Sequence, residues 1–457
     1  MTTASLELII QDILRERPGL KHLYTDTSII EYLHPALTWK QQKNIFPYAD
    51  LLQQKITASV EKLYGNELAN QAEEQLKNSW VIETGAHLHI PRRFNRAAPT
   101  QEPQINSLLF QGQVIWAYAN QKVGNNLAIS LNSGRVPLDN TNSGAYLDLP
   151  ALKAPLTLAS KKKHPDSPQS LIPARTKEEI QPKMDLLEMY KKQRILPETQ
   201  YMMGQKVLNN FLEIQSSFSD QIATSHALLI NQVAPVTQIT LDSELISTEF
   251  LLALLKDPSS LTFSIFNDPQ KKADFLEVLD GIRTGWTKDS SPFYTVHHTG
   301  KGFRLLKYTG DLSPDKLIKG LEEKTLWPTG VMKFFTFMVE AGILPIGGWT
   351  QAGYCTEIRN KSEILLRKFG YEERANCLKN MPTHIVAVGP CWKTVDSNGH
   401  TKLLDPITAI LDPLSVDLSH ITDLTGKQTL LLAAPTLYEY ILKKPSPINY
   451  DDLTKML

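Results

Sequence analysis

The residues with the clearest chemical potential lie in the stretch ETGAHLHIPRRF, residues 83–94. In it His87 and His89 are separated by one residue, and Arg92 and Arg93 follow shortly after. A histidine titrates near neutral pH, so it can act as a general base or, when neutral, as a metal ligand. An arginine guanidinium binds a carboxylate or a phosphate through two parallel hydrogen bonds. The stretch therefore has three interpretations: a metal site, an anion site, or a structural turn whose histidines are hydrogen-bonded.

A metal site would need ligands that the sequence does not supply. In a strand His87 and His89 would point to the same face, which suits a metal ion. Zinc needs a third and usually a fourth ligand. The chain has no H-E-x-x-H motif, no closely spaced cysteine pair and no cluster of acidic residues near the histidines. We therefore expect no bound metal, and a metal-dependent hydrolase that uses the two histidines remains one alternative.

An anion site fits the surroundings of the histidines better. Thr84 and Gly85 end a predicted strand, and a predicted helix begins near Asn106 and Ser107. Backbone amides at a helix start bind phosphate or carboxylate groups. The glycine pattern of dinucleotide-binding loops and the Walker loop are both absent, so no motif identifies a nucleotide cofactor. A nucleotide stays one option for the anion.

A second polar loop follows another predicted strand. The stretch SLNSGRVPLDN, residues 130–140, brings polar and charged side chains just beyond the strand end, where α/β proteins usually bind their ligands. These candidate binding residues are Ser133, Arg135, Asp139 and Asn140.

A third candidate is the stretch GGWTQAGY, residues 347–354. Gly347 and Gly348 precede a predicted helix, and glycines there let a ligand approach the backbone closely. Close packing beneath a buried helix is the alternative explanation for the two glycines. The side chains that could stack on a ligand or hydrogen-bond to it are Trp349, Gln351 and Tyr354.

The elements that must position these loops follow from the hydrophobic pattern. WVIETG is typical of a strand, residues 104–123 have the spacing of a helix, and residues 125–132 form a second strand. Strand, helix and strand in this order predict a parallel sheet with loops at the carboxyl ends of its strands. We therefore expect an α/β protein with a Rossmann-like core, a helical region and a β-hairpin insertion.

The later part of the chain adds several predicted elements. Residues 293–297 and 303–308 flank HHTGKG, which predicts an antiparallel hairpin. Pro328 suits the start and Gly342 the end of a helix that is apolar nearly all round and therefore buried. ILPIGG and PTHIVAVG each predict a strand. The stretch KQTLLLAAPTLYEYILKK, residues 427–444, predicts a strand followed by a helix.

Composition excludes several classes of partner. Lys plus Arg and Asp plus Glu both number 48, so the formal net charge is zero, and we expect no nucleic-acid partner. No stretch reaches the roughly 18 apolar residues of a membrane span, so we expect no membrane partner. Three widely spaced cysteines, Cys355, Cys377 and Cys391, predict reduced thiols and a cytoplasmic location.

The chain of 457 residues is long enough for two or three domains. Residues 156–182 are rich in Lys, Pro and Ser and predict a flexible loop. It separates residues 1–155, the N-terminal helices and first half of the core, from residues 183–395, the second half with the hairpin and the glycine-rich turn. Residues 396–457 form a C-terminal strand–helix segment. The sequence predicts no particular oligomeric state.

The succession of these motifs resembles the bacillithiol synthase family, which adds cysteine during bacillithiol assembly. That family has a Gly-Gln-Gln-x-Gly-Leu loop, a Gly-Pro-Leu-Tyr helix start and, after the next strand, a Glu-Asp-His-Asp loop. An Arg-Pro helix start and a Gly-Pro-Gly-Glu turn followed by Tyr come later in the family. The resemblance spans about residues 45–390, and the family's C-terminal coiled coil has no counterpart here.

The resemblance carries over to particular residues. TGAHLHI stands at the first loop, with Thr84, Gly85, His87 and His89, and NSLLFQGQ stands at the helix start, with Asn106 and Ser107. SGRVPLDN takes the place of the acidic loop without its His, and Trp327 replaces the Arg before Pro328. The residues that match the glycine-rich turn are Gly347, Gly348, Gln351 and Tyr354.

Together these features predict a small-molecule biosynthetic enzyme. The resemblance implies that it condenses an amine or thiol nucleophile of amino-acid type with a small acceptor that carries a carboxylate or phosphate, in a ligase-like formation of a C–N bond. His87, His89 and Asp139 are the candidate catalytic residues, with a histidine as general base. The alternative is a non-catalytic binding or interaction protein, since the acidic-histidine loop is missing. The residues expected to hold the substrate anion are Arg92, Arg93 and Arg135.

Overall fold

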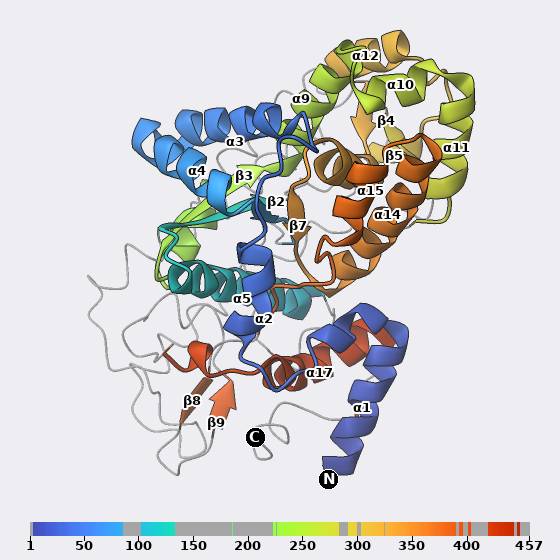
Figure 1. The fold of residues 1–457 in the computed structure, drawn as a ribbon. Helices are drawn as coiled ribbons and strands as arrows, with labels where there is room; N and C mark the ends of the chain where they lie inside the picture. The colour runs from blue at the N-terminus through green and yellow to red at the C-terminus, as the bar shows by residue number, and fades with distance from the viewer. Residues whose placement is uncertain are drawn as a thin grey trace.

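Figure 1 shows the ribbon of the protein, taken from a computed structural model. It is a mixed α/β molecule with a four-stranded sheet packed between helices. The predicted flexible loop at 156–182 lies outside the part that is described. The structure describes residues 3–85, 102–132, 185, 223–224, 226–282, 291–298, 303–323, 325–389, 393–395, 401–403, 419–442 and 446–447.

The central sheet has the strand order β3-β2-β1-β7, and all its pairs are parallel. β1 (Val81–Glu83) and β2 (Leu127–Asn132) are joined through helix α5 (Glu102–Lys122), which confirms the predicted strand–helix–strand unit. β3 (Thr237–Asp242) pairs with β2, and β7 (Leu344–Ile346), predicted from ILPIGG, pairs with β1. All four strands therefore end at one side of the sheet, here named the carboxyl edge.

The two faces of this sheet pack against different helices because strand side chains alternate between faces. Val81 and Ile346 belong to the hydrophobic cluster that includes α5. Ile82 and Ile239 belong to a second cluster on the opposite face. In Figure 1, α3 and α4 lie on one side of the strands and α5 on the other. The helices of the second cluster are α3 (Ala49–Tyr64), α4 (Asn66–Asn78) and α9 (Ser243–Lys256).

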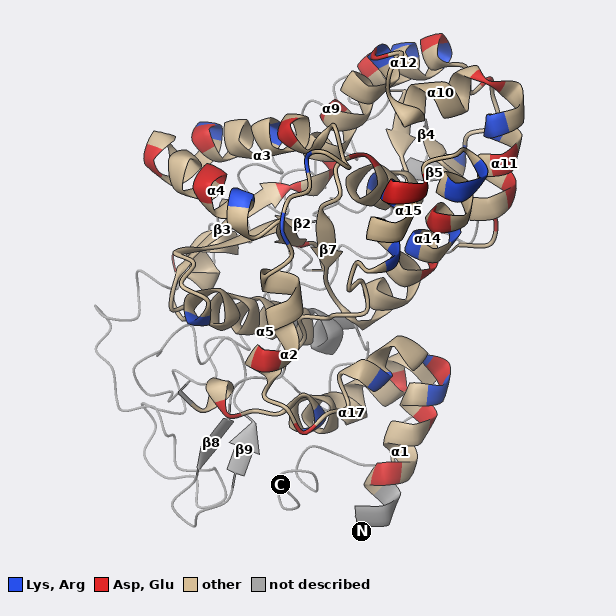
Figure 2. Cartoon of the chain, in the orientation of Figure 1, with Lys and Arg blue, Asp and Glu red and all other residues tan. Residues whose placement is uncertain are grey.

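Helix α5 is an interior helix. All its side chains from Leu108 to Asn120 are buried except that of Tyr118, which is half-buried. It contacts α2 (Ile29–Leu37) and α17 (Gly426–Leu442) as well as β2. In Figure 2 charged residues gather on outer helices such as α3 and α4, whereas the described part of α5 is mostly uncharged, with Lys122 in its last turn. Polar side chains along α5 must therefore find their partners inside the protein.

The N-terminal helices pack against the end of the chain. α1 (Thr3–Glu16) is one of the N-terminal helices expected in residues 1–155, and it contacts α17. α2 begins at Ser28, whose hydroxyl accepts from the Glu31 amide in a capping box. The predicted strand within residues 427–444 was wrong, because α17 is helical throughout. Its apolar run is buried on all sides, and such a run suits a buried strand and a buried helix equally.

The predicted hairpin is confirmed. β4 (Phe293–His298) and β5 (Phe303–Lys307) pair antiparallel, and β6 (Leu326–Pro328) adds a third strand on the other side of β4. Phe293 packs on Phe266 with ring centroids 5.8 Å apart. Figure 1 places this small sheet beside α10 (Leu261–Asn267) and α11 (Pro269–Leu279), and the chain reaches β6 through α12 (Pro314–Glu322).

The predicted buried helix between Pro328 and Gly342 exists, with a different start. Pro328 is the last residue of β6, and Thr329 caps helix α13 (Gly330–Phe335) through a bond from the Met332 amide. A single π-helical turn, η2 (Thr336–Glu340), continues it. Gly342 has φ +66°, where a glycine is favoured, and its turn sends the chain into β7. As predicted, the stretch is buried, with every residue from 331 to 342 in the interior.

The last part of the fold is helical around β7. α14 (Trp349–Lys368) follows β7 as predicted, and α15 (Glu372–Lys379) packs on it. The strand predicted from PTHIVAVG is reduced to one parallel bridge between Gly347 and Val386. The remaining described elements are η4 (Ser419–Thr422) and a small hairpin, β8 (Lys393–Val395) with β9 (Thr401–Leu403). No described helix has the length and apolar character needed to cross a membrane.

A histidine pair ties the N-terminal region to the segment after α15. His384 stacks on His22, the last residue of η1 (Pro18–His22), with ring centroids 4.1 Å apart. Burial, with the nearby His22 and Arg359 acting in the same direction, lowers the pKa of His384 to about 4. This ring therefore stays neutral at physiological pH.

Candidate functional site

Two of the three predicted loops meet at the carboxyl edge of the sheet. Thr84 follows β1 and Gly347 follows β7, and these strands are neighbours. The Thr84 amide donates to the carbonyl of Ile346 at 2.6 Å, and its hydroxyl donates to the same oxygen at 3.1 Å. The Gln351 side-chain amide donates to the Thr84 hydroxyl. Two segments that are more than 260 residues apart in sequence are thus joined by hydrogen bonds.

Glycine is required where these two segments touch. A Cβ atom on Gly85 would lie 2.5 Å from the Cα of Gly347, far inside van der Waals contact. A Cβ on Gly347 would overlap the side chain of Gln351, and one on Gly348 would lie 2.6 Å from Leu109. The space directly beside these glycines is therefore occupied by protein atoms, which is the close-packing explanation of the glycine pair.

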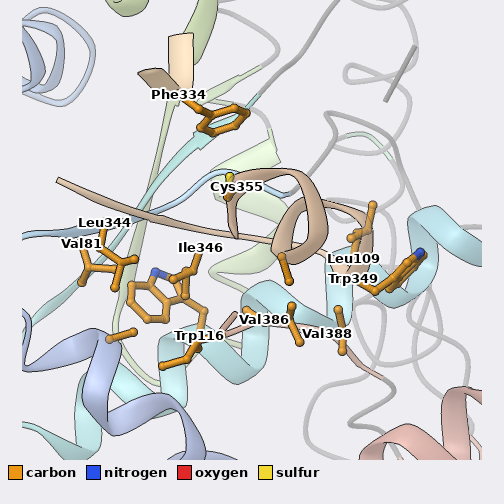
Figure 3. Close-up of a cluster of buried hydrophobic side chains, with 14 of the residues drawn as sticks. Val81, Leu109, Trp116, Phe334, Leu344, Ile346, Trp349, Cys355, Val386 and Val388 are labelled. Carbon is orange, nitrogen blue, oxygen red and sulfur yellow. The ribbon is translucent and has the colours of Figure 1, made fainter. Parts of the chain in front are cut away.

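The side chains predicted to contact a ligand near this turn are mostly buried. Trp349 and Gln351 are each 3% exposed, and Tyr354 is half-buried with its ring 5.4 Å from that of Phe334. Figure 3 shows Trp349 beside Leu109, and Phe334 and Cys355 farther along the same cluster. These side chains pack into the hydrophobic core beside the carboxyl edge of the sheet.

The other predicted site residues cannot be placed in this way. Asn106 and Ser107 lie within α5, and their side chains fall outside the described part of the structure. The convergence of the loop after β2 with the loops after β1 and β7 therefore stays a prediction, supported by the position of β2 next to β1. The predicted site residues outside the described ranges are His87, His89, Arg92, Arg93, Ser133, Arg135, Asp139 and Asn140.

A buried polar chain lies under α5 at the same edge. Glu83, the last residue of β1, accepts from the backbone amide of Gly85 at 2.7 Å and from the side-chain amide of Gln113 at 3.4 Å. The Gln113 carbonyl oxygen lies 2.7 Å from Nε2 of His226, so that ring nitrogen is the donor. Glu83 is 2% exposed, and Gln113 and His226 are fully buried. The chain links the end of β1 to the helical stretch that precedes β3.

Further polar side chains continue this layer across the sheet. Glu83, Ser130 and Thr240 lie in register on β1, β2 and β3 and face α5 together. The Gln238 side-chain amide donates to the Ser130 hydroxyl at 2.8 Å. In most proteins such a sheet face is apolar. Here a buried polar layer runs toward the carboxyl edge between α5 and the strands.

A buried ion pair lies beyond the end of β3. Lys333 Nζ is 3.2 Å from a carboxylate oxygen of Glu244, and it donates to the Ser243 hydroxyl at 2.8 Å. The lysine and glutamate side chains are 4% and 5% exposed. Trp327 Nε1 donates to the other carboxylate oxygen of Glu244 at 3.1 Å. Because both charges are paired and hydrogen-bonded, the Lys333 amine is committed to this pair.

The only cysteine at this edge within the described residues is not a ready nucleophile. Cys355 is fully buried, and burial raises the pKa of its thiol well above the usual value. Lys333 and Gln351 act in the opposite direction but are outweighed. Since a thiolate and not a thiol attacks substrates, we assign no catalytic role to Cys355.

Sequence reasoning missed the buried polar residues, although a signal was present. Gln113 and Lys333 each interrupt an otherwise apolar helical run, and Glu83 ends an apolar strand. A polar residue in such a place must have a partner, but the pattern does not say which one. No three His, Cys, Asp or Glu side chains gather as a metal site among the described residues.

No protein-family model, curated protein or solved structure matches this chain.

Proposed function

We propose that this chain is a small-molecule enzyme that condenses an amine or thiol nucleophile of amino-acid type with a small, anionic acceptor. The observation that supports the proposal most is the meeting of Thr84–Gly85 with Gly347–Gly348 at the carboxyl edge of the parallel sheet. Ligands of α/β proteins bind at this edge. Parallel strands with helices on both faces also suit a Rossmann-like core, the fold expected from the resemblance to bacillithiol synthases.

In this proposal the loops after β1 and β2 provide the chemistry. His87 or His89 takes a proton from the nucleophile, whose lone pair then attacks the electrophilic carbon of the acceptor. The bond from that carbon to an oxygen breaks, and the oxygen leaves as water with the proton returned by the histidine or, from a phosphorylated acceptor, as phosphate. Arg135, with Arg92 or Arg93, holds the carboxylate or phosphate of the acceptor. The hydrogen bond of Gln351 to Thr84 and the Glu83–Gln113–His226 chain fix the end of β1, the strand that carries the first of these loops.

The test is a condensation assay with isotope-labelled cysteine and a panel of small acceptors, including a sugar malate and phosphorylated sugars, each with and without ATP. Mass spectrometry detects a product that contains the label. His87→Ala and His89→Ala should reduce turnover about 100- to 10,000-fold at the position that acts as base. His34→Ala, an exposed histidine of α2, is the matched control and should keep full activity. Product formation that survives both loop variants would contradict the assigned roles.

A non-catalytic binding protein on the same fold is the second candidate. It is favoured by the filled space beside Gly85 and Gly347, which leaves no room for a ligand directly at these two positions. This candidate predicts saturable binding of an anionic small molecule without any labelled product. Binding and turnover measured on the same preparation therefore separate the two functions.

A further inference from the structure

The indole of Trp349 is a buried hydrogen-bond donor without an acceptor. Its side chain is 3% exposed, and within the described structure its Nε1 has no hydrogen-bond partner. Trp80 donates to the carbonyl of Ala341 at 2.8 Å, and Trp39 donates to that of Gly342 at 3.0 Å. A buried donor left unpaired lowers stability, so it calls for an explanation such as a ligand that completes it.

This donor belongs to a helix start that lacks a side-chain cap. Trp349 is the first residue of α14, whose cap residue is Gly348, and the first turn of the helix holds no acidic residue. By contrast Asp242 and Ser260 cap α9 and α10 with side-chain oxygens. The first amides of a 20-residue helix carry a partial positive charge that favours an anion.

The indole lies at the helix start itself, because Trp349 is the first residue of α14. In Figure 3 Trp349 lies to the right of Cys355, and the indole nitrogen is at the right-hand end of the ring, away from Cys355. Leu109 lines this region, since it contacts the position of Gly348 and lies beside the indole in the figure. Tyr440 of α17 closes another side, with its ring centroid 6.1 Å from that of the indole.

From these observations we infer that an oxyanion, a carboxylate or phosphate group, binds at the start of α14. It accepts hydrogen bonds from Trp349 Nε1 and from the first amides of the helix. The inference rests on the proposed function, because it assigns the place where the anionic acceptor is held. It adds an uncharged hydrogen-bond donor, so binding of the anionic substrate does not depend on the loop arginines alone.

Glu83, the acidic residue that ends β1, is already engaged. Glu83 accepts from the Gly85 amide and from Gln113, so its carboxylate does not cap α14 in the described structure. The start of α14 therefore has no carboxylate cap among the described residues. Hydrogen bonds to an ionised acceptor are stronger than neutral ones, so the loss of Nε1 should weaken anion binding about 10- to 100-fold.

The experiment follows the indole N–H signals of the full chain, labelled with nitrogen-15, during titration with inorganic phosphate and separately with malate. Sodium chloride at equal ionic strength is the reference. The chain has seven tryptophans and therefore seven indole N–H signals, so a single shifted signal can be recognised in the wild-type spectrum. We expect saturable movement of the signal that disappears in Trp349→Phe. The anion that saturates at lower concentration identifies phosphate or carboxylate as the group recognised.

The variant adds a second measurement. Trp349→Phe keeps the ring but removes the donor, so it should bind the anion about 10- to 100-fold more weakly. Without the anion it should melt at or above the wild-type temperature. Trp80→Phe, the matched control, should melt lower, because it removes a satisfied bond to Ala341. No saturable shift with either anion, or equal affinity in Trp349→Phe, would overturn the inference.

The two proposals fail separately. If an anion binds through Trp349 but no condensation product forms, the proposed function is wrong and the anion site stands. If a product forms while the Trp349 signal stays unchanged on addition of phosphate and malate, the site is wrong and the function stands.

Discussion

Gly112 on α5 tests how closely this helix approaches the segment beside β7. A Cβ atom there would lie 2.8 Å from the carbonyl carbon of Ala387 and 2.9 Å from the Cα of Val388. That segment cannot retreat easily, because the Ala387 amide donates to the Gly347 carbonyl at 2.9 Å and the Gly389 amide to that of Leu108, also at 2.9 Å. The change Gly112→Ala therefore forces buried backbone against buried backbone.

Two opposing effects decide the size of the change. Alanine in place of glycine within a helix is favourable by about 1 kcal/mol. Overpacking a filled interior costs about 1–3 kcal/mol and occasionally more. Because the clash is with backbone and not with a flexible side chain, we take the upper end. The free energy of unfolding of Gly112→Ala should fall by about 2 kcal/mol.

Gly353 provides a matched control within α14. It is exposed, and a Cβ atom there would have nothing within 4 Å. Gly353→Ala should therefore show the helix preference alone and gain about 1 kcal/mol. Urea unfolding followed by circular dichroism should give midpoints on opposite sides of the wild-type value. If Gly112→Ala raises the midpoint as Gly353→Ala does, the close approach of α5 to residues 387–388 is refuted.

Three further predictions concern pH, charge and metal. Because the pKa of His384 is lowered to about 4 in the folded protein, the unfolded chain binds more protons than the folded one between pH 6.5 and 4. The free energy of unfolding should therefore be greatest above pH 6.5 and fall by about 1–2 kcal/mol toward pH 4, after discounting for partial exposure. His384→Gln should remove this loss, and an unchanged slope would contradict the assignment. Lys333→Met should lower the free energy of unfolding by about 3–5 kcal/mol, because it leaves Glu244 buried and unpaired, and adding Glu244→Gln should restore part of that loss. Equal stability of the single and double variants in urea unfolding would argue against the pair. Purified protein should hold less than stoichiometric transition metal by elemental analysis, and one zinc per chain, lost in His87→Ala and His89→Ala, would reverse that expectation.

The sequence by itself determined the elements whose signals are local. The order strand, helix, strand around α5 predicted a parallel pair, because alternation and helical spacing are set by neighbouring residues. The turn residues HHTGKG between two β-prone runs predicted the hairpin of β4 and β5 for the same reason. Even the positions of Thr84–Gly85 and Gly347–Gly348 at strand ends were readable, since each follows a short apolar run.

Local patterns failed where burial is complete. The run LLLAAPTL in α17 predicted a strand, although it is part of a helix, because an apolar run without alternation has no period to distinguish the two. The stretch HIVAVG predicted a strand for the same reason, yet beside β7 it forms only the bridge between Gly347 and Val386. In both cases the neighbours in space, and not the sequence, settled the backbone conformation.

Only the tertiary structure decided which polar residues act together. Gln351 meets the Thr84 hydroxyl across 267 positions, and Lys333 meets Glu244 across 89. No spacing rule links residues so far apart, because their contact depends on how β1, β7 and α14 pack and on where α9 begins. A buried polar group must be paired inside the fold, so the sequence determined that Gln113 and Lys333 needed partners. Which partners they obtained was decided by packing, since that alone brings distant segments to the same edge of the sheet.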